Sequence, residues 1–134
     1  GNNEVWSFGG KVFGILKKYL NIREIMRPYI RELMRQAHEK GTPVMRTMFY
    51  EFPDDEKCWE LKDQYMFGSD ILVAPVVYKN MTGREVYLPK GVVWTNLHDG
   101  KKYEGGQYVF AEAPLDVIPV FARDNRKNEW IGII

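Results

Sequence analysis

The sequence predicts an α+β fold in which a long helix and a strand precede a small antiparallel β-sandwich. Apolar residues in the first third recur at spacings of three and four, which is the period of one helix face. Short strand-like runs separated by turn residues fill the second half. The change between the two patterns falls near Phe67-Gly68, so we predict two parts, residues 1–68 and residues 69–134.

The first predicted element is a helix that ends before Gly41. Its apolar face comprises Val12, Phe13, Leu16, Tyr19, Leu20, Met26, Ile30, Leu33, Met34 and Ala37. We expect Pro28 either to kink this helix or to start a second one, because proline lacks the N–H and clashes with the preceding turn. The charged run His38-Glu39-Lys40 before Gly41 is typical of a helix C-terminus.

A strand is predicted directly after this helix, at residues 43–49. A helix, a tight turn and a strand make half of a β/α repeat. Pro53 ends the strand, and Asp54-Asp55 stand where a helix N-cap is favourable. We therefore expect a short helix through Trp59 and Leu61.

Five strands are predicted in the second half. They cover residues 71–77, 84–88, 92–97, 107–111 and 117–122. Between the third and fourth, Asp99-Gly100 is a strong hairpin signal, since both central positions of such a turn take positive φ. Short strands at this spacing are typical of a small antiparallel sandwich.

The composition is that of an ordinary globular chain, with 134 residues of which 45% are hydrophobic and 28% charged. The formal net charge is +1, from 19 basic and 18 acidic residues that are interleaved, so no nucleic-acid partner is predicted. No apolar run is long enough to predict a membrane span. Because the first residue is Gly1 rather than Met, we expect a fragment or a processed product.

Cys58 is the only cysteine, so the chain forms no intramolecular disulfide. One cysteine with His38 and His98, which are distant in sequence, does not have the spacing of a zinc site. We therefore predict no metal and no cofactor, and expect Cys58 to pack as a small apolar side chain. A reducing compartment is favoured, which predicts a cytoplasmic protein.

The acidic residues are the candidates for acid and base catalysis. They are Glu51, Asp54, Asp55, Asp63 and Asp70. A helix cap accounts for Asp54 and Asp55, and Asp63 and Asp70 flank a turn. Nothing in their spacing brings two of them together, so we assign no catalytic residue to this chain.

A series of motifs runs through nearly the whole chain, from about Trp6 to Arg123. The motifs are the runs at residues 27–33, 37–46, 63–68, 70–76, 84–89, 113–116 and 118–121, together with Phe49-Tyr50-Glu51-Phe52-Pro53-Asp54-Asp55. In this order they resemble glycoside hydrolase family 31. The resemblance departs at Thr47, where the family usually has proline, and at Asp124-Asn125, where a glycine is common.

The resemblance implies an α-glucosidase or α-xylosidase in which a (β/α)₈ barrel precedes β-sandwich domains. On that pattern the long helix is similar to the seventh barrel helix, and Val44-Met45-Arg46 and Phe49 are similar to the eighth strand. The region from about Ile71 is similar to the proximal C-terminal sandwich. The implied fold is thus the terminal helix and strand of a (β/α)₈ barrel followed by a small antiparallel β-sandwich.

The family's chemistry is retaining, with an aspartate nucleophile and an aspartate acid/base that lie on earlier barrel strands. No residue of this chain matches either motif, and a barrel takes about 250 residues. We therefore expect the chain alone to be inactive and to support the rest of the parent barrel, which binds the α-linked oligosaccharide. Arg46, at the end of the strand, is expected to form a buried ion pair with Glu51 rather than to serve as a site residue.

Two other functions are compatible with the sequence. Trp94, Tyr103 and Tyr108 would make a carbohydrate-binding sandwich if they shared an exposed face, although aromatic side chains on strands are more often core. The apolar helix face would alternatively pair with a second copy of the chain, because a large apolar stripe rarely stays bare.

Overall fold

The structure is a computed structural model of the chain. It describes residues 2–76, 78, 80–114 and 117–134; within the first helix, the described side chains are those of residue 10, residues 13–14 and residues 16–40. Val77, Leu115 and Asp116, which the sequence places in a strand and a motif, lie outside these residues. The side chains of Trp6 and Val12 lie outside them as well.

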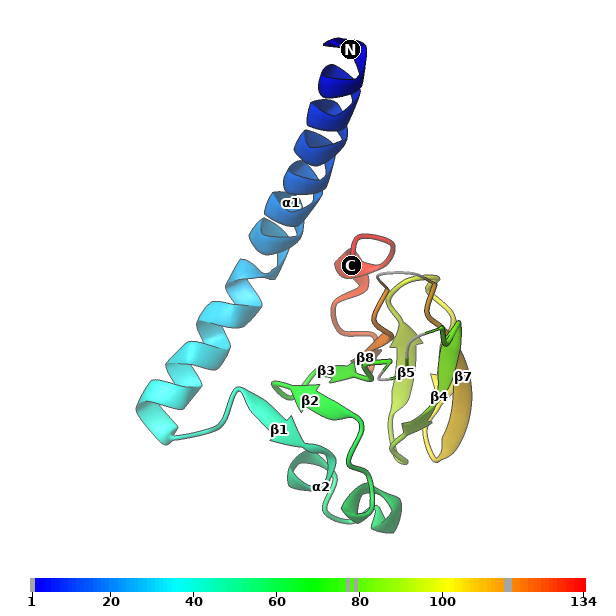
Figure 1. Ribbon diagram of the computed structural model, residues 1–134. Coiled ribbons are helices and arrows are strands. Elements are labelled where there is room, and N and C mark those ends of the chain that lie inside the picture. The colour runs from blue at the N-terminus through cyan, green and yellow to red at the C-terminus, as the bar shows by residue number, and fades with distance from the viewer. Residues whose placement is uncertain (1, 77, 79, 115–116) are drawn as a thin grey trace.

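A long helix leads into a set of short strands (Figure 1). The elements are α1 (Asn2–Lys40), β1 (Met45–Thr47), α2 (Met48–Glu51), η1 (Glu56–Trp59), β2 (Tyr65–Phe67), β3 (Ile71–Val73), β4 (Gly83–Leu88), β5 (Val93–Asn96), β6 (Lys102–Glu104), β7 (Gln107–Glu112), β8 (Val120–Arg123) and η2 (Asn128–Trp130). The N-terminal part of α1 extends away from the strands (Figure 1).

The helix α1 is one element with Pro28 inside it, so of the two alternatives predicted for Pro28 the start of a second helix is excluded. It ends where the sequence predicts. Gly41 has a φ of 68° and its N–H donates to Ala37 O at 3.1 Å, which is how a glycine closes a helix in the left-handed conformation.

Two antiparallel sheets form the rest of the fold. The larger has six strands in the order β1-β2-β3-β8-β5-β6, and the smaller pairs β4 with β7. Every neighbouring pair is antiparallel. The predicted small antiparallel β domain with a helix is therefore confirmed.

Side chains alternate between the two faces of the larger sheet, as the pleat requires. On β3, Leu72 points into a core shared with β4 and β7, and Ile71 points into a second core under α1. On β8, Phe121 and Ala122 divide in the same way. The molecule thus has three layers: α1, the six-stranded sheet, and the β4–β7 pair.

The predicted strands differ from the observed ones mainly in length. The strand expected at residues 43–49 covers only Met45–Thr47, because the chain turns into the short helix α2 at Met48. The strand expected at residues 71–77 ends at Val73, and the one expected at residues 117–122 begins at Val120. The helix expected through Leu61 is a 3₁₀ turn that ends at Trp59.

Two strands were not predicted, β2 and β6. β6 follows the Asp99-Gly100 turn and pairs with β5, so that hairpin is confirmed with a partner strand that the sequence pattern did not reveal. Gly100 has the expected positive φ, 76°. None of the described helices is both long and apolar enough to cross a membrane.

We expect the thiol of Cys58 to be unreactive in the folded chain. The side chain is fully buried, and burial, reinforced by the carboxylate of Asp55, raises the pKa of the thiol to about 12. The thiolate is the form that attacks a thiol reagent, and it is scarce below that pH. Titration with an aromatic disulfide at pH 8 should label almost no protein when folded and one thiol per chain in denaturant. Rapid labelling of the folded chain would contradict the burial.

Candidate functional site

Three charged side chains meet where β1, α2 and β8 converge, and we call Arg46, Glu51 and Arg123 the Glu51 cluster. Arg46 Nη1 donates to Glu51 Oε1, and its Nε donates to Pro43 O at 2.7 Å. Arg123 Nη1 lies 3.4 Å from the other oxygen, Glu51 Oε2. The predicted Arg46–Glu51 ion pair is therefore confirmed, and its side chains are only 5% and 13% exposed.

Arg123 ties this cluster to the second half of the chain. It is 72 residues from Glu51 and also donates to Ser69 O at 3.2 Å. Its guanidinium carbon lies 4.7 Å from the centre of the Phe52 ring, a cation–π distance. One carboxylate thus pairs with two guanidinium groups from distant segments, an arrangement that fixes α2 against the end of β8.

A second set of contacts holds α1 to the turn between β2 and β3. The hydroxyl of Tyr29 donates to Phe67 O at 2.6 Å and accepts from Asp70 N–H at 3.1 Å. Its ring packs edge-on against Phe67 and Trp130. Burial raises the pKa of Tyr29 to about 12, so the hydroxyl stays protonated and remains a donor across the neutral range.

The acidic residues that the sequence offered as catalytic candidates are held mostly by structural partners. Asp70 pairs with Arg126 at 2.5 Å, and Asp63 pairs with Arg84 at 3.0 Å.

Asp55 is the N-cap residue of η1, as predicted. Its Oδ1 accepts from Lys57 N–H at 3.2 Å. Its Oδ2 accepts from the Tyr87 hydroxyl at 2.8 Å and from Lys90 N–H at 2.9 Å. The carboxylate of Asp55 therefore joins the loop before η1 to the end of β4.

Three of the five candidates nevertheless line one groove, of about 230 Å³. Its lining residues are Glu51, Phe52, Pro53, Asp54, Asp55, Lys90, Gly91, Val92 and Arg123. A retaining glycosidase needs one carboxyl to protonate the leaving group and another to attack, about 5–5.5 Å apart. In this groove both oxygens of Glu51 face guanidinium groups and both oxygens of Asp55 accept hydrogen bonds, so only the exposed Asp54 is free. That the chain holds no catalytic residue stays a prediction.

The aromatic residues that the sequence suggested for a carbohydrate-binding surface do not share an exposed face. Trp94 is fully buried, and its Nε1–H donates to Pro89 O at 3.0 Å, which confirms its expected place in the core. Tyr103 is half-buried against Phe121. Only Tyr108, 47% exposed, reaches solvent.

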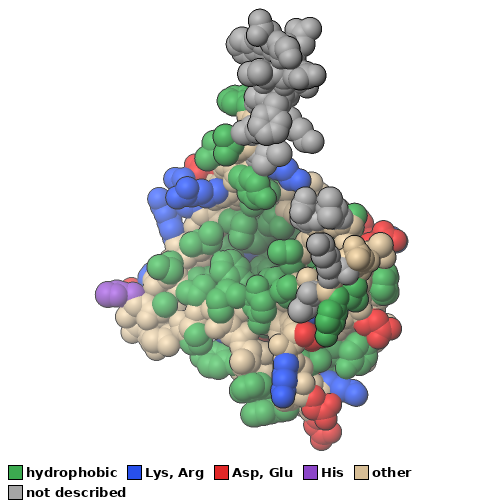
Figure 2. Space-filling view, viewed as in Figure 1, with side chains coloured by type: hydrophobic (Ala, Val, Ile, Leu, Met, Phe, Trp, Pro, Cys, Tyr) green, Lys and Arg blue, Asp and Glu red, His purple; other side chains and the backbone are tan. Residues whose placement is uncertain are grey.

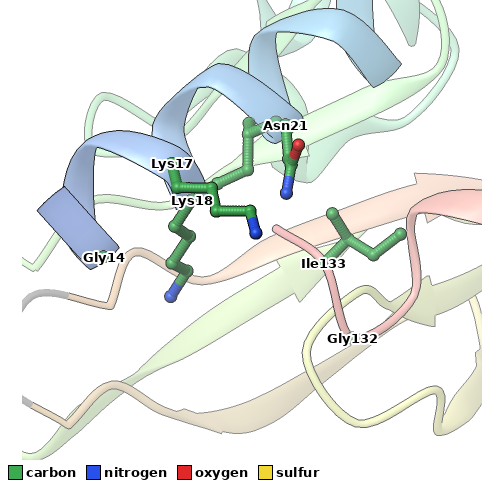
Figure 3. Close-up of a pocket in the computed structure, with 7 residues that line it drawn as sticks. Gly14, Lys17, Lys18, Asn21, Gly132 and Ile133 are labelled. Carbon is green, nitrogen blue, oxygen red and sulfur yellow. The ribbon is translucent and has the colours of Figure 1, made fainter.

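An open pocket of about 350 Å³ lies between α1 and the C-terminal turn (Figure 3). The helix contributes Lys17, Lys18 and Asn21, and the turn contributes Gly132 and Ile133. Among the described residues that line it there is no acidic side chain and no histidine. His98 lies elsewhere, with Nε2 2.8 Å from Ile118 O. Among the described residues, no three His, Cys, Asp or Glu side chains gather as metal ligands would.

Comparison with known proteins gives the family. A family model described as the C-terminal domain of glycosyl hydrolase family 31 matches residues 41–126, more than half of the chain. The chain belongs to glycoside hydrolase family 31. This confirms the resemblance carried by the sequence motifs, and it agrees with the antiparallel β fold that follows α1.

Several family 31 proteins resemble the chain closely. The "Alpha-glucosidase 2" of Bacillus thermoamyloliquefaciens is 41% identical over 120 residues, which are 90% of this chain and 15% of that protein. The "Alpha-xylosidase" of Saccharolobus solfataricus is 35% identical over 96% of this chain and 18% of its own length. The crystal structure of a GH31 alpha-xylosidase from a soil metagenome, complexed with xylose, is 44% identical with a TM-score of 0.83. It is matched over 94% of this chain and 19% of that one, so the chain spans less than a fifth of these family 31 proteins.

Proposed function

We propose that the chain is the C-terminal segment of a retaining α-glycoside hydrolase that acts on terminal α-linked glucose or xylose. In this proposal α1 and β1 are the last helix and strand of the (β/α)₈ barrel, residues 1–68, and residues 69–134 are the proximal sandwich. The segment supports the barrel and contributes no catalytic carboxylate. The whole enzyme forms and hydrolyses a covalent glycosyl intermediate with carboxylates from earlier barrel strands.

The apolar surface that the chain leaves uncovered supports this role most directly. The side chains of Phe13, Leu16, Tyr19 and Leu20 on α1 are all more than half exposed. Hydrophobic side chains also gather over the middle of the face seen in Figure 2. An apolar surface of this kind marks a contact with further protein. The rest of a barrel is the partner that fits a helix in this position.

The open edge of the larger sheet supports the same role. β1 is the end strand of that sheet and pairs only with β2 among the described strands. Sheet edges with free backbone groups are normally paired or covered in finished folds. We propose that a preceding barrel strand lies along β1, and that the Glu51 cluster holds β1 and α2 in place for it.

The proposal predicts that the purified chain hydrolyses neither an aryl α-glucoside nor an aryl α-xyloside. The decisive test is a chimera in which residues 1–134 replace the matching segment of the soil-metagenome α-xylosidase. Because the two segments are 44% identical with similar structure, the chimera should fold and keep α-xylosidase activity within about tenfold of the parent. Steady turnover by the isolated chain, surviving repurification, would overturn the proposal. So would a folded chimera without activity.

The exposed helix face leaves self-association as a second hypothesis for the isolated chain. The same four side chains of α1 would then pack against a second copy. Sedimentation of the isolated chain over a wide concentration range tests it, and a strict monomer would rule it out.

The cytoplasmic location also remains a proposal, based on the single thiol.

A further inference from the structure

The outer face of the β4–β7 pair carries aromatic and acidic side chains in alternation. In the antiparallel register Tyr87 lies opposite Tyr108, Glu85 opposite Phe110, and Gly83 opposite Glu112. Residues directly opposite share a face, so these three pairs lie on one side of the sheet. The other side carries Val86 and Ala111 into the core. On this side Gly83 and Tyr87 are buried, whereas Glu85, Tyr108, Phe110 and Glu112 are exposed. The β4–β7 pair lies on the side of the molecule away from α1 (Figure 1).

The ring of Phe110 lies next to Gly83 on the neighbouring strand. A methyl group placed on Gly83 would come within 2.7 Å of Phe110 Cζ and 2.8 Å of Cε1, so the ring occupies the space where a side chain would stand. Aromatic side chains cover sheet glycines diagonally in this way. The contact places the tip of the ring against β4, and the side chain remains 59% exposed to solvent. Phe110 therefore presents an exposed aromatic side chain that is supported by β4.

Tyr108 stands next to it, about 7 Å away along the same strand. Its ring rests on Tyr87 with centres 5.0 Å apart, and Lys57 Nζ lies 5.9 Å from its centre. These neighbours restrain Tyr108 while leaving it 47% exposed. The two rings make a short aromatic row on a part of the fold that the Glu51 cluster does not touch.

The acidic side chains beside the aromatic row indicate which kind of ligand can bind there. The side chains of Glu85 and Glu112 are exposed beside the rings. An apolar protein surface seated here would desolvate both carboxylates without supplying donors, which is costly. A sugar ring suits both the aromatic rings and the carboxylates. Its C–H face packs on an aromatic ring, and its hydroxyl groups donate to carboxylate oxygens.

We propose that the outer face of β4 and β7 is a binding surface for a gluco-oligosaccharide. Phe110 and Tyr108 stack on successive sugar rings, and Glu85 and Glu112 accept hydrogen bonds from sugar hydroxyls. The choice of a glucose-based chain rests on the proposed function. The surface would hold a long substrate beside the enzyme without taking part in bond cleavage.

The test is a titration of the full 134-residue chain, labelled with ¹⁵N, with maltotetraose and separately with isomaltotriose. We expect saturable shifts of the amides of β4 and β7. Phe110→Ala should weaken binding about tenfold, the loss expected for one aromatic stacking contact. Phe110→Leu keeps an apolar cover over Gly83 but has no aromatic face, so it should weaken binding equally while the melting temperature stays close to that of the unchanged chain.

Trp59→Ala is the matched control, because Trp59 is 58% exposed and stacks on Phe49 rather than on either ring of the aromatic row. It should leave sugar affinity unchanged. Shifts that map to the groove around Asp54, equal weakening by Trp59→Ala, or no saturable shift with either sugar would each overturn the proposal. The outcome is independent of the hydrolytic role, since Phe110→Ala in the chimera should leave hydrolysis of a small aryl α-xyloside unchanged.

Discussion

Replacing Glu51 by glutamine should lower the free energy of unfolding by about 3–5 kcal/mol. The change keeps the size of the side chain but removes the negative charge between Arg46 and Arg123. Arg46 is only 5% exposed at its side chain, so water cannot replace the lost carboxylate. An intact buried ion pair adds little stability compared with well-packed apolar side chains. Removing one partner is nevertheless strongly destabilising, because the other charge stays buried without compensation. Urea unfolding followed by far-ultraviolet circular dichroism measures the change.

The control for this experiment is Glu32→Gln on the exposed side of α1. Glu32 accepts two hydrogen bonds from Arg35, at 2.5 and 2.9 Å, and these contacts lower its pKa to about 2. Both partners are nearly half exposed, so solvent competes for each charge and we expect no resolvable change in stability. If Glu51→Gln lowered the free energy of unfolding as little as Glu32→Gln, the Glu51 cluster would be a surface feature and its proposed role in holding α2 would be wrong.

Local chemistry explains which features the sequence could predict. Arg46 and Glu51 are five positions apart on adjoining elements, so their pairing follows from a strand turning into a helix. The Asp99-Gly100 hairpin follows from backbone conformation alone, because Gly100 adopts the positive φ that the turn requires. The core position of Trp94 follows from its place in a run of apolar strand residues.

Long-range pairing explains what the sequence could not predict. Arg123 completes the Glu51 cluster across 72 residues, and nothing near either residue marks the other as its partner. β2 has only three residues, and it exists because β1 and β3 pair on either side of it. A segment so short has no period of its own to detect.

The division near residue 68 has a similar difficulty. It was inferred from a change in composition, whereas hydrogen bonding continues across it. β2 pairs with β3 over a tight turn, so strands on both sides of residue 68 belong to one sheet. The boundary between barrel and sandwich stays a prediction, to be decided by the strand that we propose to pair with the free edge of β1.

Gly68 lies in that turn, and we expect Gly68→Ala to destabilise the chain by about 2–5 kcal/mol. Its φ of 65° belongs to the left-handed region, which costs an alanine about 1–2 kcal/mol. The added methyl would also lie 2.2 Å from Tyr29 Oη and 2.5 Å from Leu33 Cδ2. Both atoms belong to buried side chains of α1, and overpacking of this kind costs about 1–3 kcal/mol. The strain and the steric clash therefore add.

Gly41→Ala separates these two causes. Gly41 has nearly the same φ, 68°, but an added methyl would meet nothing within 4 Å. The Gly41→Ala variant should therefore lose only the stability that the left-handed backbone costs an alanine, about 1–2 kcal/mol. The excess loss in Gly68→Ala then measures how firmly Tyr29 and Leu33 are held against the turn between β2 and β3. Hydrogen exchange should locate that loss in α1 around residues 25–37 as well as in the turn. If the two variants lost the same stability, α1 could move away from the added methyl without a cost in free energy. Its packing on the sheet would then contribute little to the stability of the chain.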